Sequence, residues 1–161
     1  KTIEIINTDA EGRLTLADAV YYATNNLGAT KLIDLATLTG ACVSALGEQV
    51  SGAVTNNDEF FSELVKANER AGEIVWRMPT IEYYKKMNES KVADLKNSGG
   101  KLGGMMTAGL FVGSFLAKED IPWIHIDIAG TAYITEKFGY LKENATGTLV
   151  KSLYYMLSKE A

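Results

Sequence analysis

Short apolar segments alternate along the chain with segments of helical periodicity, and this alternation limits the folds that the chain can adopt. Runs of β-branched and other apolar residues predict strands at residues 1–6, 31–36, 49–55, 75–78 and 123–128. Apolar side chains that recur every three or four positions predict helices at residues 15–27, 41–46, 60–71, 80–87, 107–116 and 146–158. This order predicts an α/β fold, in which the first two strands are parallel and joined by a right-handed crossover.

A polar cluster, NTDAEGR at residues 7–13, follows the first predicted strand. Active sites of open α/β sheets collect at the carboxyl ends of strands, so this cluster is a candidate site. In extended backbone the side chains of Asp9 and Glu11 face the same side, and both carboxylates would converge on a divalent cation. Arg13 would place a fixed positive charge beside them. The alternative is that the two acidic residues only favour the N-terminus of the next helix.

Three further segments allow a chemical and a structural interpretation. Residues 37–40 end the second predicted strand, and the free backbone N–H groups of the next helix could bind an anion there. The glycine-rich residues 97–104 match neither nucleotide-binding spacing, so we interpret them as an active-site loop that leads into a helix. His125, the only histidine, could form a ligand pair with Asp127, but a histidine inside a strand is more often a hydrogen-bonded core residue.

Composition excludes several classes of protein. A length of 161 residues suits one domain, and 47% hydrophobic with 22% charged residues excludes disorder. No apolar run approaches the roughly 20 residues that a membrane-spanning helix needs. The net charge of −4, with scattered basic residues, argues against a nucleic-acid surface. The single cysteine, Cys42, excludes an internal disulfide, suits a reducing cytosol and is interpreted as a core residue.

The octapeptide NTDAEGRL at residues 7–14 resembles, residue for residue, the signature of the leucyl (cytosol) aminopeptidase family of two-metal exopeptidases. The resemblance continues in the family's order at residues 36–41, 75–79, 93–100 and 125–131. It implies a three-layer αβα sandwich around a mostly parallel (mixed) sheet. Residues 1–161 would form the C-terminal portion of a larger catalytic domain. Lys1, which opens directly into a strand, fits a chain that begins inside a larger protein.

The resemblance also implies an activity: the release of N-terminal amino acids, such as leucine, from peptides by metal-activated water. In the family the Asp9 position binds one metal ion and the Glu11 position bridges two, which would be zinc or manganese, or else magnesium. Arg13 would hold a bicarbonate ion that acts as general base, or it would steady the tetrahedral intermediate. The resemblance places substrate contacts at Asn7, Thr37, Leu38, Gly40 and Ala129.

The family's remaining metal ligands, a lysine and two aspartates, lie in an upstream segment together with a catalytic lysine, and none of those motifs is in this chain. The isolated chain is therefore expected to be inactive, as an incomplete fragment or an assembly module. The family implies a cytoplasmic hexamer of two stacked trimers. DNA binding, a second role of some members, is a third hypothesis that the acidic charge balance disfavours.

Overall fold

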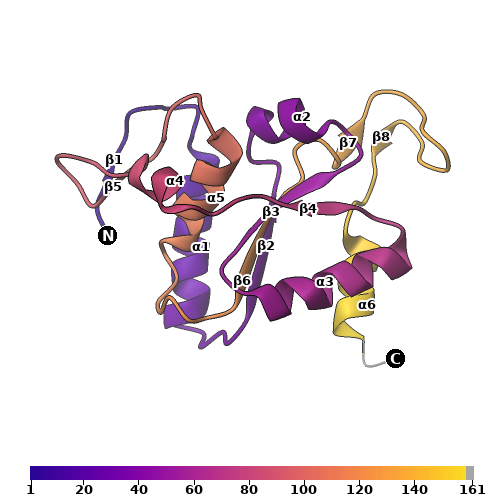
Figure 1. Ribbon diagram of the computed structural model, residues 1–161, viewed down its shortest axis with the longest axis horizontal. Coiled ribbons are helices and arrows are strands. Elements are labelled where there is room, and N and C mark those ends of the chain that lie inside the picture. Colours follow the sequence, from indigo (N-terminus) through magenta and orange to yellow (C-terminus); the bar gives the residue numbers. More distant parts are fainter. Residues whose placement is uncertain (159–161) are drawn as a thin grey trace.

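The computed structural model describes residues 1–158. Its strands are β1 (Ile3–Glu4), β2 (Leu32–Ala36), β3 (Ser51–Thr55), β4 (Val75–Arg77), β5 (Leu95–Lys96), β6 (Trp123–Asp127), β7 (Tyr133–Ile134) and β8 (Asn144–Ala145). Its helices are α1 (Gly12–Asn25), α2 (Gly40–Leu46), α3 (Asp58–Ala71), α4 (Glu82–Lys86), α5 (Gly104–Gly113) and α6 (Val150–Leu157). The α/β alternation predicted from the sequence is therefore present, with the main strands between two groups of helices (Figure 1).

A four-stranded sheet forms the centre, in the order β2–β6–β3–β4. Strands β2 and β6 are parallel, as are β3 and β4, whereas β3 and β6 are antiparallel. The sheet is thus mixed, with parallel pairs at both edges. Because β2 and β6 are parallel, Ala36 and Asp127 end at the same edge of the sheet, with Ala36 opposite Asp127 in the register.

Side chains on the two faces of the sheet enter two separate hydrophobic cores. On one face, Trp123 packs in a buried cluster with residues of α1 and α5, including Val20 and Phe111. On the other face, Ile124 and Ile126 pack in a second cluster with Phe60 and Leu64 of α3. This alternation follows from the two-residue period of a strand. It confirms the three-layer arrangement, with α1 and α5 on one side of the sheet and α3 on the other.

Two glycines allow α5 to approach the sheet closely. A Cβ atom built on Gly109 would lie 2.8 Å from Val54 Cγ2, and one on Gly113 would lie 2.5 Å from Trp123 Cζ3. Both separations are shorter than van der Waals contact. Residues with side chains at these positions would force the helix away from the sheet.

We expect Gly113→Ala to lower the free energy of unfolding by about 1–3 kcal/mol, because the added methyl group would overpack the buried Trp123 ring. Urea denaturation followed by circular dichroism would measure the change. Gly40→Ala is the matched control, since a Cβ there meets no atom within 4 Å. Equal stability of the two variants would contradict the close-approach explanation.

His125 is a buried, hydrogen-bonded core residue, as the favoured interpretation predicts. Its Nδ1 atom lies 2.5 Å from Oδ1 of Asp34, its register partner on β2. The indole Nε1 of Trp123 donates to the other oxygen of Asp34 at 2.7 Å. Within residues 1–158, no group of three or more His, Cys, Asp or Glu side chains is arranged to hold a metal ion. The His125–Asp34 pair therefore joins β2 to β6.

The prediction for the first strand is wrong in its extent and its partner. Only Ile3–Glu4 are in strand conformation, and they pair in parallel with β5 in a separate two-stranded sheet. Ile5 and Ile6 are about half exposed, at 51% and 52%. A crossover from β1 into the sheet of β2 is therefore not observed in the described residues. The cause is a distant partner: Thr2 donates through its backbone N (2.6 Å) and hydroxyl (2.8 Å) to Asp94, 92 residues away.

The last helix is shorter than predicted and packs mainly on α3 rather than on the sheet. It begins at Val150 because Leu149 adopts a left-handed backbone conformation with φ of 64°. The carboxylate of Glu73 fixes this start by accepting from the backbone N of Leu149 at 2.6 Å and of Ser152 at 3.1 Å. Among residues 1–158, the helices are too short or too polar to cross a membrane.

Candidate active site

The segment that carries Asp9 and Glu11 is a turn, not the extended strand end that the sequence predicts. Asn7 organises the turn: its side-chain oxygen accepts from Asp9 N at 3.0 Å, and its backbone oxygen accepts from Ala10 N at 3.3 Å. Glu11 has helical dihedral angles, φ −77° and ψ −36°, and immediately precedes α1. The prediction that Asp9 and Glu11 face the same side of an extended strand is therefore wrong. The turn nevertheless leaves Asn7, Asp9 and Glu11 exposed.

The carboxylates of Asp9 and Glu11 are not engaged by other groups in the described chain. Neither forms a hydrogen bond or an ion pair among residues 1–158, and the Glu11 side chain makes no capping bond to α1. The alternative interpretation stays open, because Glu11 occupies the N-cap position of α1, where a negative charge is favourable even without a capping bond. Both carboxylates keep their oxygen lone pairs free for a ligand.

Asn97 is a fully buried residue that binds this turn. Its Oδ1 accepts from the backbone N atoms of Ile6 (3.0 Å) and Asn7 (3.2 Å). Its Nδ2 donates to the backbone oxygens of Asn7 (2.6 Å) and Ala10 (3.4 Å). The end of β1 and the turn are thus attached to the start of the glycine-rich loop, 97–104. That loop continues directly into α5, as predicted.

Arg13 lies at the start of α1 and is 9% exposed. Its Nη1 donates to the backbone oxygen of Asn97 at 3.0 Å, whereas its buried Nε has no hydrogen-bond partner in the described chain. Burial lowers the pKa of the Arg13 guanidinium below its ordinary value, although the negative charges of Asp127 and Glu11 oppose this shift. Arginine is still protonated at physiological pH. The site therefore contains a buried cation with an unused donor.

Asp127 ends β6 as a fully buried carboxylate and holds the neighbouring loops. Its Oδ1 accepts from the backbone N atoms of Leu38 and Ala129, each at 3.1 Å. Its Oδ2 accepts from the hydroxyl of Thr39 at 2.6 Å, and the same hydroxyl caps α2 by accepting from Cys42 N at 3.0 Å. One carboxylate thus positions the loop after β2 and the loop after β6.

Cys42 lies beneath these loops and is fully buried. Its Sγ is 3.5 Å from the backbone oxygen of Asp127. Burial, together with the charge of Asp127, raises the pKa of the Cys42 thiol to about 11. A thiol that is buried and protonated at neutral pH is a poor nucleophile, which confirms Cys42 as a core residue.

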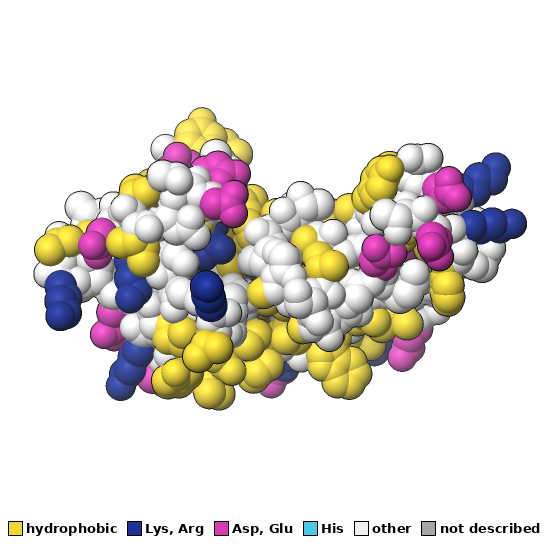
Figure 2. Space-filling model, turned by 90° about the horizontal axis from the view of Figure 1, so that it is seen from above, with side chains coloured by type: hydrophobic (Ala, Val, Ile, Leu, Met, Phe, Trp, Pro, Cys, Tyr) yellow, Lys and Arg dark blue, Asp and Glu magenta, His cyan; other side chains and the backbone are white. Residues whose placement is uncertain are grey.

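The predicted residues lie in two loop systems of the structure. The first is the turn with Asn7, Asp9, Glu11 and Arg13. The second, held by Asp127, carries Thr37, Leu38, Gly40 and Ala129, of which Thr37 and Gly40 are exposed. The two systems meet where a Cβ on Gly12 would lie 3.9 Å from Leu38 Cδ1. Viewed from above, the outline of the molecule is concave between two projecting ends, each of which carries acidic side chains (Figure 2).

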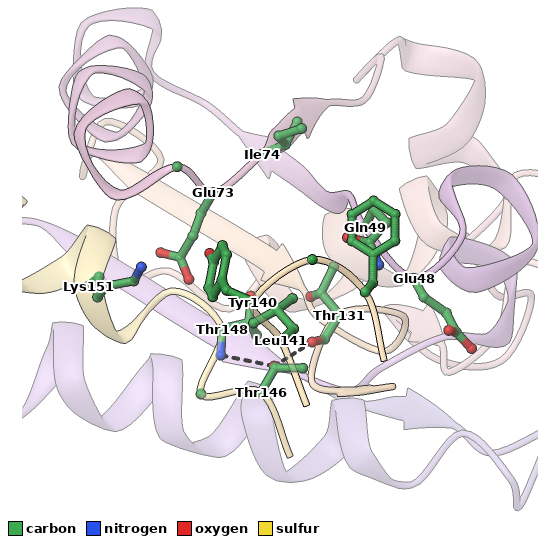
Figure 3. Close-up of a pocket in the computed structure, with 14 residues that line it drawn as sticks. Glu48, Gln49, Glu73, Ile74, Thr131, Tyr140, Leu141, Thr146, Thr148 and Lys151 are labelled. Atoms are coloured by element: carbon green, nitrogen blue, oxygen red, sulfur yellow. Dashed lines mark hydrogen bonds between the residues drawn. The ribbon is translucent and has the colours of Figure 1, made fainter. Parts of the chain in front are cut away.

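Two hollows lie next to the Asp127 loops. A groove of about 460 Å³ is lined by residues of α2, α5 and the 97–104 loop, including Ala41, Met105 and Lys101. Ala41 directly follows Gly40, so the groove adjoins the candidate site. A second pocket, of about 320 Å³, lies beyond Thr131, where Glu73, Tyr140 and Lys151 surround it (Figure 3). It is lined by none of the predicted site residues.

The roles of Asn97 and Asp127 do not follow from the residue pattern. The pattern suggests Asp127 only as a metal-ligand partner of His125, and Asn97 only as part of a resemblance. Each acts on segments 84 to 91 residues away, so periodicity and local spacing carry no signal for them. A buried polar side chain inside an apolar segment, such as Asp127 within WIHIDIA, is the one local hint.

Comparison with known protein families matches residues 1–154 to the catalytic domain of the cytosol aminopeptidase family. The chain belongs to this family. The resemblance seen in the octapeptide therefore extends over almost the whole chain. The family also agrees with the fold, because the chain has the mixed α/β architecture of the C-terminal part of leucine aminopeptidases.

Individual relatives support the assignment. A probable cytosol aminopeptidase of Clostridium tetani (strain Massachusetts / E88) is 54% identical over 156 residues, covering 97% of this chain and 32% of its own length. Leucine aminopeptidase 1 of Arabidopsis thaliana is 50% identical over 161 residues, covering 100% of this chain and 30% of its own length. The chain thus spans about a third of the length of these cytosol aminopeptidase relatives.

Solved structures of the family superimpose closely. A mutant of tomato leucine aminopeptidase gives a TM-score of 0.89 at 50% identity, covering 97% of this chain and 30% of that one. The bottromycin maturation enzyme BotP in complex with Mn gives a TM-score of 0.90 at 35% identity, covering 96% and 34%. The fold of this chain is therefore that of the family's C-terminal region.

Proposed function

We propose that this chain supplies part of the active site of a two-metal aminopeptidase that releases N-terminal amino acids, leucine and similar residues, from peptides. The observation that carries the proposal is that the exposed turn with Asp9 and Glu11 leads directly into Arg13, a buried cation on which the charge of Glu11 acts. The turn adjoins the loop after β2, which Asp127 holds, because a Cβ on Gly12 would lie 3.9 Å from Leu38 Cδ1.

The donor set fits divalent metal ions. Asp9 and Glu11 offer hard carboxylate oxygens that accept zinc, manganese or magnesium, and both residues are exposed and form no ion pair within residues 1–158. BotP has been solved in complex with Mn, which supports manganese as the first ion to test. When bound, two such ions would polarise the scissile carbonyl and lower the pKa of the attacking water.

The other residues have roles that follow from their position. Arg13, with its unpaired buried Nε, would hold a small anion such as bicarbonate as a general base, or would stabilise the negative charge of the tetrahedral intermediate. Five residues are proposed to contact the peptide's backbone or side chains around these groups: Asn7, Thr37, Leu38, Gly40 and Ala129. Of these, Leu38 and Ala129 are held in place by Asp127.

Two carboxylates are too few for a two-metal centre. Within residues 1–158 no third His, Cys, Asp or Glu side chain joins Asp9 and Glu11. We therefore propose that the remaining ligands and a catalytic lysine come from outside these 161 residues. On its own the chain would be a catalytically incomplete fragment, or an assembly module. The relatives, which are about three times as long, support this view.

Activity assays of the isolated chain and of the full-length protein that contains it test this proposal. We expect the isolated chain to give no hydrolysis of a leucyl chromogenic amide above background in the presence of Mn²⁺, while the full-length protein turns it over. Turnover by the isolated chain would contradict the incompleteness of its site. Absence of turnover by the folded, Mn²⁺-loaded full-length protein with several aminoacyl amides would contradict the aminopeptidase assignment.

Assembly and location are proposed from the family alone. The full-length protein would form a cytoplasmic homo-hexamer that acts on peptides, since several relatives are named cytosol aminopeptidases, although one Arabidopsis relative is chloroplastic. Size-exclusion chromatography with light scattering would give the number of subunits directly.

A further inference from the structure

We infer that Asn97 is a positioning residue that sets the conformation of the Asp9–Glu11 turn for metal binding and also directs the Arg13 guanidinium. This inference rests on the proposed function, because it assigns Asn97 a role toward the metal-binding groups. It concerns a residue that contacts neither metal nor peptide in the proposal and acts only through its hydrogen bonds to the turn.

The hydrogen bonds of Asn97 saturate its side chain. An asparagine amide has two N–H donors and an oxygen that accepts two bonds, and each of these four capacities is used on the segment 6–10. The side chain is fully buried, so water cannot replace these partners. Asn97 therefore contacts residues on both sides of Asp9 and fixes the path of the backbone between them.

The backbone of Asn97 forms hydrogen bonds with two further groups, on Glu4 and on Arg13. Its N–H donates to the backbone oxygen of Glu4 at 3.0 Å, which aligns β1 beside β5. Its backbone oxygen accepts from Arg13 Nη1 at 3.0 Å, which directs the guanidinium. One residue thus determines where the strand ends, where the turn lies and where the cation points. A shift of Asn97 would move all three together.

The other hydrogen bonds that shape the turn are local. They come from Asn7, and the turn is also held by Ala10, which is buried at 5% exposure between the exposed Asp9 and Glu11. Removal of the Asn97 side chain would leave four backbone groups without their partners, and the turn would gain freedom. Replacement of a residue that orients metal ligands through hydrogen bonds typically lowers metal affinity or activity by about 10–100-fold.

The test uses the full-length protein with Asn97→Ala and Asn97→Asp variants. Asn97→Ala removes all four side-chain bonds, whereas Asn97→Asp keeps an acceptor for Ile6 and Asn7 but loses both donors. The affinity for Mn²⁺ alone, without peptide, is measured from the electron paramagnetic resonance signal of the free ion. We expect Asn97→Ala to weaken Mn²⁺ binding by about 10–100-fold, with a smaller loss for Asn97→Asp.

Asn88→Ala is the matched control. Asn88 is also a buried asparagine, 2% exposed, and its Nδ2 donates to the backbone oxygen of Thr107 at 2.8 Å, away from the turn. This variant should lose thermal stability, measured by circular dichroism, while its Mn²⁺ affinity remains that of the unsubstituted protein. If Asn97→Ala does not fold, the comparison is made with Asn97→Asp below its melting temperature.

The outcomes separate the inference from the proposed function. In one outcome, Asp9→Asn weakens Mn²⁺ binding, but the folded Asn97 variants bind Mn²⁺ as tightly as Asn88→Ala. This result would refute the positioning role of Asn97 and would still support the metal site. If Asp9→Asn also leaves Mn²⁺ binding unchanged, the proposed metal site itself fails. Weak binding by the Asn97 variants, with normal binding by Asn88→Ala, supports the inference.

Discussion

Replacing Glu11 with glutamine in the full-length protein is expected to reduce hydrolysis of a leucyl chromogenic amide by at least about a thousandfold. The amide has nearly the shape of the carboxylate but no charge, so it binds divalent cations weakly. Metal ions contribute several kcal/mol to stabilisation of a hydrolytic transition state. Because about 1.4 kcal/mol corresponds to a factor of ten in rate, a loss of about 4 kcal/mol gives this factor.

Metal content provides the second measurement for the same site. Glu11→Gln and Asp9→Asn should each lower the Mn²⁺ retained after dialysis, measured by atomic absorption. Asp18→Asn, which neutralises an exposed carboxylate farther along α1, should change neither metal content nor rate. If the Asp9 and Glu11 variants retain both metal and peptide cleavage, these residues are not the metal ligands.

Replacing Arg13 with alanine is expected to lower kcat by about 10²–10³-fold, the loss typical of removing one group that stabilises developing negative charge. The reason is specific to the geometry: Arg13 is a buried cation, directed by Asn97, whose Nε is free to bind an anion. Steady-state kinetics with the leucyl amide would measure the effect. Mn²⁺ affinity should fall much less than in Glu11→Gln, because Arg13 is not a metal ligand in the proposal.

Two comparisons decide what the Arg13 result means. Arg77→Ala removes an arginine that pairs with Asp58 on α3 at 2.6 Å, and it should leave kcat unchanged. Added bicarbonate should raise the rate of the unsubstituted protein but not of Arg13→Ala if Arg13 holds that ion. No response to bicarbonate in either protein would favour stabilisation of the tetrahedral intermediate. A normal kcat for Arg13→Ala would exclude both roles.

Only part of the candidate site could be predicted from residue patterns. The octapeptide indicates Asp9, Glu11 and Arg13 as candidate site residues, and their roles remain proposals. The predicted extended backbone was wrong, because Glu11 has helical dihedral angles. A turn and a strand end can present the same carboxylates, and only the turn's hydrogen bonds to Asn97 distinguish them.

The order of most helices and strands could be predicted from residue patterns, since it depends on periodicity within a few positions. The partner of β1, the residue at which α6 begins and the approach of the first turn to the loop after β2 could not be predicted in this way. These features depend on Asp94, Glu73, Asn97 and Asp127, which bind segments distant in the chain. Buried hydrogen bonds of this kind form only after the chain has folded, because their donors and acceptors otherwise bind water.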